Sequence, residues 1–152
     1  MSDDLDTLKR LAAQEQKLGQ LYDQVWTTYV PLTTALTETG GALAGAALNV
    51  GTYSVGPIGG GCTYSFNYPT TAKALYARLQ ASWAAASDAS LAYCIYTGGA
   101  STETGVHCVA YAASISDRKN GIVSLDASGK FSLVIVNANT TLLRLAILGY
   151  FL

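Results

Sequence analysis

The N-terminal part of the chain carries apolar side chains at alternating steps of three and four residues. These positions are Leu8, Leu11, Leu18, Tyr22, Val25, Tyr29 and Leu32. The spacing is that of a coiled-coil helix, whose apolar repeat is roughly 3.5 residues. Ser2 or Asp3 can cap the helix start, and Pro31 ends the pattern because the residue before a proline disfavours helical angles. The pattern predicts a helix within residues 1–32.

A helix with a single apolar seam needs a partner, because an isolated helix is marginal in water. The partner is either further copies of the same helix or the remainder of its own chain. The near-heptad spacing and the terminal position favour self-association, although Glu15 and Gly19 interrupt the seam. We therefore expect an oligomerisation surface formed by Leu8, Leu11, Leu18, Tyr22, Val25 and Tyr29.

The pattern changes after the helix. Residues 33–47 contain Gly40, Gly41 and Gly45 among small side chains, which predicts a linker. From residue 48 onward, short alternating apolar runs are separated by turn residues, which is typical of strands. The expected strands are Leu48–Val55, Cys62–Tyr68, Ala72–Ala84, Leu91–Thr97, Val106–Ala113, Gly121–Asp126, Lys130–Asn137 and Thr141–Phe151, with turns that include Asp117–Asn120. Residues 48–152 are therefore predicted to form a mainly β domain, an antiparallel sandwich or jelly roll.

One segment fits two structures. In residues 72–84 the larger apolar side chains recur at helical spacing, and the alanines also favour a helix. The same segment alternates strictly, with Leu75, Ala77, Leu79, Ala81 and Trp83 on one face. The surrounding strand pattern favours the strand.

Composition supports a folded domain and limits its partners. Half of the residues are hydrophobic, 12% are charged and the net charge is −1. Nucleic-acid-binding domains cluster Lys and Arg on one face, so we expect no nucleic-acid partner. The uncharged stretch Thr39–Ala72 is broken by glycines and prolines, which argues against a membrane span, and the acidic start does not resemble a signal peptide.

The three cysteines, Cys62, Cys94 and Cys108, lack the spacing of a zinc site. Cys94 and Cys108 are symmetric about Ser101, so a hairpin there could place the two thiols opposite each other. The simpler interpretation, which we favour, is that they are reduced core residues.

Catalytic chemistry has little support. His107, the single histidine, lies in an expected strand beside Cys108, so the two side chains would point to opposite faces. Turn capping accounts for Asp88, Asp117 and Asp126 more economically than a pair of catalytic carboxylates does. The sequence therefore predicts no enzyme, no metal site and no cofactor.

A binding surface is a further candidate. Loop Gly98–Gly105 is small and polar, and tyrosines are frequent nearby. Tyrosine stacks on sugars and adds a hydroxyl group, so Tyr93, Tyr96 and Glu103 form a candidate glycan-binding surface. The alternative is that these residues, with Tyr53, Tyr64 and Tyr68, only cover the sheets.

Three short segments of the C-terminal part carry a resemblance. They are Ala72–Leu79 (AKALYARL), Leu125–Phe131 (LDASGKF) and Leu148–Leu152 (LGYFL). Residues 70–152 resemble a β-sandwich module found in bacteriophage fibres and bacterial surface proteins. The resemblance implies a homotrimer that sits at the end of a short helix and decorates a capsid, neck or tail. The short and imperfect helix of this chain departs from that pattern.

Together these observations predict a structural component of a phage particle, of the fibre or decoration type. It would be assembled in the host cytoplasm, located in the virion, and bound to its own copies and to capsid, neck or tail proteins. Contact with a host-surface glycan would aid attachment. The alternative is a carbohydrate-binding adhesin module of a surface protein.

Overall fold

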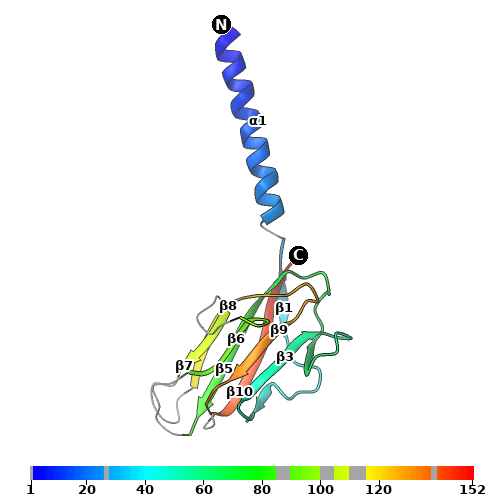
Figure 1. Ribbon diagram of the computed structural model, residues 1–152, viewed down its shortest axis with the longest axis vertical. Helices are drawn as coiled ribbons and strands as arrows, with labels where there is room; N and C mark the ends of the chain where they lie inside the picture. The colour runs from blue at the N-terminus through cyan, green and yellow to red at the C-terminus, as the bar shows by residue number, and fades with distance from the viewer. Residues whose placement is uncertain (1, 26–27, 85–89, 100–104, 110–115, 138–139) are drawn as a thin grey trace.

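The computed structural model describes residues 2–25, 28–84, 90–99, 105–109, 116–137 and 140–152. The described residues are mainly β, with ten strands and one N-terminal helix. Two five-stranded sheets pack face to face, and the helix extends away from them (Figure 1). The predicted fold class, a β-sandwich preceded by a helix, is confirmed.

Helix α1 spans Ser2–Val25 and is shorter than predicted. Strand β1 begins at Tyr29 and runs to Leu36, so Tyr29 and Leu32 belong to the sandwich and not to the helix. The chain changes conformation here because Tyr29 and Val30 pair with the last strand, opposite Phe151 and Tyr150. Backbone pairing outweighs the helical spacing, and Pro31 is tolerated because β1 is an edge strand.

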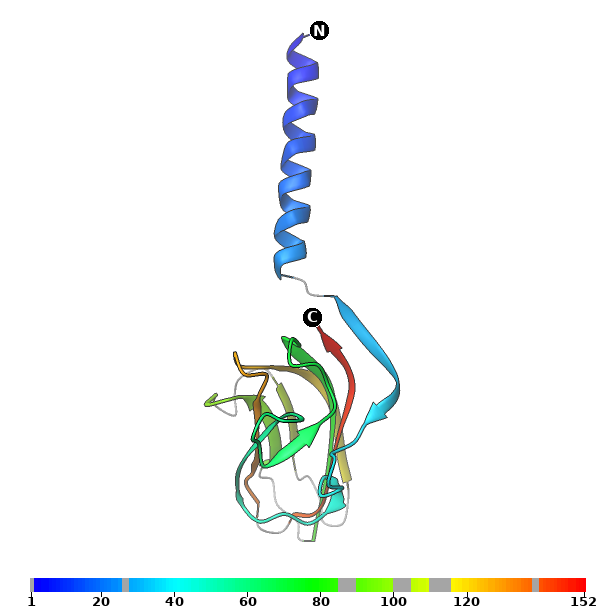
Figure 2. The ribbon, with the colours of Figure 1, turned by 90° about the vertical axis from the view of Figure 1, so that its right-hand side faces the viewer.

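The first sheet, called sheet A, contains the longest strands. Its order is β1, β10 (Thr140–Phe151), β5 (Ala74–Trp83) and β8 (Ser116–Ser124), and β2 (Ala44–Ala46) also pairs with β10. Figure 2 shows β1 lying along β10 below the helix. The predicted linker 33–47 therefore includes the end of β1 and all of β2, whose small residues pair through their backbone.

The second sheet, sheet B, consists of shorter strands. Its order is β4 (Tyr64–Phe66), β3 (Gly51–Pro57), β9 (Phe131–Ile135), β6 (Ser90–Tyr96) and β7 (Gly105–Val109). β3 and β4 run parallel, and the other pairs in both sheets are antiparallel. The chain crosses repeatedly between the sheets, as in a jelly roll.

The core lies between the sheets, and β5 contributes most regularly to it. Its side chains alternate between half-buried and buried, and the inward set Leu75, Ala77, Leu79, Ala81 and Trp83 is at most 1% exposed. The strand prediction for this segment is confirmed. Phe66, Phe131 and Leu133 of sheet B face this set and are fully buried.

β7 and β8 close one side of the sandwich. Gly121 of β8 approaches sheet B so closely that a Cβ there would lie 2.9 Å from the Gly105 carbonyl oxygen. The turn predicted at Asp117–Asn120 is wrong, because these residues lie within β8 and pair with β5. Their polar side chains indicated a turn, but they belong to an edge strand with a solvent-facing side. Among the described residues, no helix is long and apolar enough to cross a membrane.

Candidate functional site

Helix α1 presents an uncovered apolar surface. Leu5, Leu8 and Leu11 are 54%, 63% and 51% exposed. Of the predicted oligomerisation residues, Leu18, Tyr22 and Val25 lie on the helix, but their side chains are outside the described part of the structure. Tyr29 lies in β1 and is 41% exposed. Leu8 and Leu11 of the predicted oligomerisation surface are therefore exposed on α1, whereas Tyr29 belongs to the sandwich, at the start of β1.

Tyr29 belongs to an aromatic cluster on the outer face of sheet A. Its ring centroid lies 4.9 Å from that of Phe151 and 6.4 Å from that of Tyr76, the latter edge to face. The ring covers Gly149, where a Cβ would come within 2.7 Å of Tyr29 Cζ. A shift in register between Ile147 and Gly149 creates this arrangement, since it turns Gly149 outward. Strict alternation along β10 would place Gly149 on the same face as the buried Ile147, so the sequence pattern does not reveal this bulge.

The other half of the same outer face is polar and basic. Arg144 of β10 pairs with Gln80 of β5, which pairs with Arg118 of β8, so the three form one row across the sheet. Arg78 lies in the next row, opposite Ala146. These residues line a cavity of about 180 Å³ that sequence reasoning missed. The arginines are far apart in sequence, and only the strand register brings them together.

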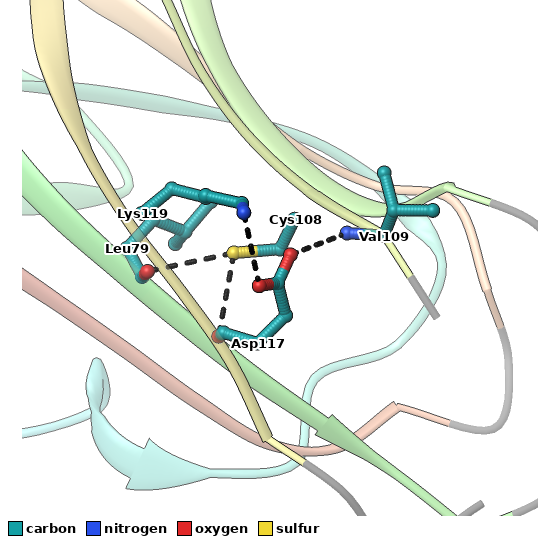
Figure 3. A network of polar contacts seen from close by, with 5 residues as sticks. All are labelled: Leu79, Cys108, Val109, Asp117 and Lys119. Atoms are coloured by element: carbon teal, nitrogen blue, oxygen red, sulfur yellow. Dashed lines mark hydrogen bonds and ion pairs between the residues drawn. The ribbon is translucent and has the colours of Figure 1, made fainter. Parts of the chain in front are cut away.

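The described carboxylates of the sandwich are bound to backbone amides. Glu38 is buried and accepts a hydrogen bond of 2.7 Å from the Ala42 N–H. Asp117 accepts one of 2.9 Å from the Val109 N–H and lies 3.5 Å from the Lys119 ammonium (Figure 3). This contact joins β8 to β7, and no converging pair of acids results from it.

Asp126 caps the turn between β8 and β9. Its Oδ1 accepts hydrogen bonds from the N–H groups of Ser128 and Lys130 at 2.8 and 2.9 Å. Desolvation alone would raise the pKa of this carboxyl group, but the two hydrogen bonds favour the charged form and hold the pKa below its usual value. Tyr68 fastens the same turn by donating to the Gly129 carbonyl oxygen at 2.6 Å. Turn capping, as predicted for Asp126, is confirmed.

Cys94 and Cys108 are buried free thiols. They are not opposite each other, because Cys94 pairs with Val106 and Cys108 pairs with Ala92. Figure 3 shows the Cys108 thiol directed at the carbonyl oxygens of Leu79 and Asp117, at 3.4 and 3.6 Å. Burial raises the pKa of Cys108 to about 12 and raises that of Cys94 as well. The interpretation as reduced core residues is confirmed, and neither thiol is set up as a nucleophile.

His107 lies on the opposite face of β7 from Cys108, as predicted from strand alternation. It is half-buried, while Val106 and Cys108 on either side are buried. Its ring packs edge to face on Tyr93 of the neighbouring strand, with centroids 5.7 Å apart. Among the described residues, no group of three or more metal-ligating side chains is present.

The predicted glycan-binding residues are not gathered into one surface. Tyr93 and Tyr96 are three positions apart in a regularly paired strand, so alternation turns them to opposite faces. Glu103 lies outside the described residues. Tyr53 and Tyr64 pack partly buried against the core, and Tyr68 is buried.

Comparisons with known proteins give no indication of the function of the chain. No protein-family model matches the chain, and no curated protein matches it. The two features that the described structure offers are the uncovered leucine surface of α1 and the basic cavity on sheet A.

Proposed function

We propose that the chain is a structural protein of a phage particle, of the fibre or decoration type, which assembles through α1 and displays the sandwich. One observation carries the proposal: Leu8 and Leu11 are more than half exposed on a helix that extends away from the sandwich. Apolar side chains in a row along a helix are costly in water, and packing against other copies of the helix removes that cost.

The aromatic cluster below the helix supports the same assembly. Tyr29, Tyr76 and Phe151 lie on the outer face of sheet A, on the strand that follows α1 and the strands paired beyond it. Ile122, on the neighbouring strand, is 50% exposed and extends this apolar area. Copies that associate through α1 would bring these surfaces close together. A homotrimer, as the resemblance to phage fibre modules implies, would cover both surfaces.

The remaining parts of the proposal rest on the resemblance of residues 70–152 to phage modules. They are the location in the virion, after assembly in the host cytoplasm, and the binding to capsid, neck or tail proteins. Display of the sandwich outward would let it stabilise the particle or touch a host-surface glycan. Mass spectrometry of purified particles tests this location, and absence of the chain from them would contradict it.

Light scattering coupled to size-exclusion chromatography tests the assembly. The full chain is expected to elute with the mass of a trimer, and the double variant Leu8→Gln/Leu11→Gln is expected to elute as a monomer with an unchanged β-type circular dichroism spectrum. Ile58→Gln is the matched control, because Ile58 is as exposed as Leu11 but follows β3 in the sandwich and is not on the helix. Elution of the full chain with the mass of a monomer would contradict the proposal.

A further inference from the structure

Three of the four arginines in the sequence line one cavity on the outer face of sheet A. Arg144, Gln80 and Arg118 come from three adjacent strands and share one row, and Arg78 adds a third guanidinium from the next row. Arg118 donates a hydrogen bond of 3.2 Å to Gln80 Oε1, so the amide helps to hold this guanidinium over the cavity. Three positive charges therefore converge on a small volume.

No described carboxylate neutralises these charges. Glu38, Asp117 and Asp126 are bound to amides elsewhere, and the one ion pair found among the described residues joins Lys119 to Asp117. Guanidinium groups stay charged at all ordinary pH values, so the repulsion among them cannot be relieved by loss of a proton. An anion is the species that would relieve it.

The cavity is built to hold a small group. Besides the arginines and Gln80, its lining includes Thr37, Leu43, Ala44, Leu145 and Ala146. Gly45 closes tightly on Arg144, since a Cβ there would lie 3.1 Å from Arg144 Nε, and its φ of 130° favours glycine. At about 180 Å³ the cavity is smaller than the pockets of roughly 300–1,000 Å³ that hold drug-sized ligands, which suits one anionic group or a single sugar.

We propose that this cavity is a binding site for an oxyanion, the carboxylate, phosphate or sulfate group of a small ligand. Arginine is suited to this task because its planar guanidinium donates two parallel hydrogen bonds to such groups. The site is independent of the helix and of the assembly proposed for it. An acidic sugar and free inorganic phosphate carry the same chemistry, and the experiment separates them.

Isothermal titration calorimetry on the full chain tests the site, with sodium phosphate, sodium glucuronate and uncharged glucose as probes. Titrations at a fixed ionic strength of about 0.15 M screen diffuse surface attraction. We expect saturable binding of phosphate or glucuronate and none of glucose. Tighter binding of glucuronate than of phosphate assigns the site to a sugar acid, and the reverse order assigns it to a free oxyanion.

Two variants and a control locate the binding. Arg118→Gln and Arg144→Gln are each expected to raise the dissociation constant of the anion about tenfold or more, because each variant loses one charge-assisted hydrogen bond. Lys73→Gln removes the same charge from an exposed position before β5 and is expected to bind like the wild type. Equal binding by all three variants, or none by the wild type, would overturn the proposal.

Thermal unfolding and light scattering distinguish an anion site from a structural role of the same arginines. In the absence of ligand, Arg118→Gln and Arg144→Gln are expected to unfold at the same temperature as the wild type or higher, because each relieves repulsion. A lowered unfolding temperature that high salt abolishes would reveal an acidic partner within the chain and count against the site, because salt screens an ion pair but leaves the Arg118–Gln80 hydrogen bond in place. A changed oligomer mass in either variant would make the cavity an interface between copies and overturn it too.

Discussion

Gly149 shows how a single missing side chain shapes the outer face of sheet A. The Tyr29 ring lies over it, within 2.7 Å of the place where a Cβ would be. We expect Gly149→Ala to displace this ring and to lower the free energy of unfolding by about 1–3 kcal/mol, the usual cost of overpacking. Urea denaturation followed by fluorescence measures the change.

A double-mutant cycle separates the ring contact from any other effect of the methyl group. In a Tyr29→Ala background, the same Gly149→Ala change is expected to cost clearly less, because the ring that it would displace is gone. An equal cost in both backgrounds would contradict the role of the ring and place the strain in the backbone of β10.

Asp126 makes the stability of the sandwich depend on pH. Its lowered pKa means that the folded state binds the proton less readily than the unfolded chain does. The stabilisation is therefore complete above the unfolded pKa of about 3.9 and is lost as the pH falls through the folded value. Asp126→Asn is expected to lower the free energy of unfolding by about 1 kcal/mol at pH 7. The value is small because the turn is partly solvated.

The pH profile is the decisive measurement for Asp126. The difference in unfolding free energy between wild type and Asp126→Asn is expected to stay constant above about pH 5 and to shrink below about pH 4. A difference that is the same at pH 3 and pH 7 would show that the shape of the turn matters and the charge does not.

At the scale of elements, α1 and β1 have separable roles. α1 carries the exposed leucines, while β1 pairs with the end of β10 from Tyr29 to Leu36. Deleting residues 1–25 is expected to leave the sandwich folded and monomeric. Deleting residues 1–36 is expected to lower its stability strongly, because the upper edge of β10 loses its partner.

Thermal unfolding and light scattering on the two deletions distinguish these roles. An unfolding temperature close to that of the full chain is expected for the shorter deletion, apart from any contribution of assembly. If the shorter deletion still formed trimers, the copies would associate through the sandwich. The aromatic cluster on sheet A would then be the contact surface.

Sequence periodicity predicts those elements whose two faces differ in polarity. β5 is the best case, because its inward apolar set alternates strictly and the core confirms it. β1 could not be predicted in this way, because Tyr29 and Leu32 continue the helical spacing of the preceding residues. A local sequence pattern does not show that β1 pairs with β10, which is distant in the sequence. The start of β8 resembles a turn because an edge strand exposed to water has turn-like composition.

At the scale of the whole molecule, the sequence predicted the sandwich and its order after a helix, but not the basic cavity. Arg78, Arg118 and Arg144 are isolated residues in the sequence, and they converge because β8, β5 and β10 are neighbours in one fixed register. The usable signal was that Arg78 and Gln80 share the polar face of β5 and that charges are otherwise scarce. Register between distant strands is a property of the folded chain.

The pairing of β1 with β10 fixes where the chain ends. The Leu152 N–H donates to the Thr28 carbonyl oxygen at 3.0 Å, so the C-terminus lies at the root of α1 (Figure 2). A fluorescent protein or affinity tag fused after Leu152 would lie beside α1 and would clash with neighbouring copies of the chain. Cargo meant to be presented outward belongs at the opposite pole, where β5 finishes at Trp83 and β10 starts at Thr140.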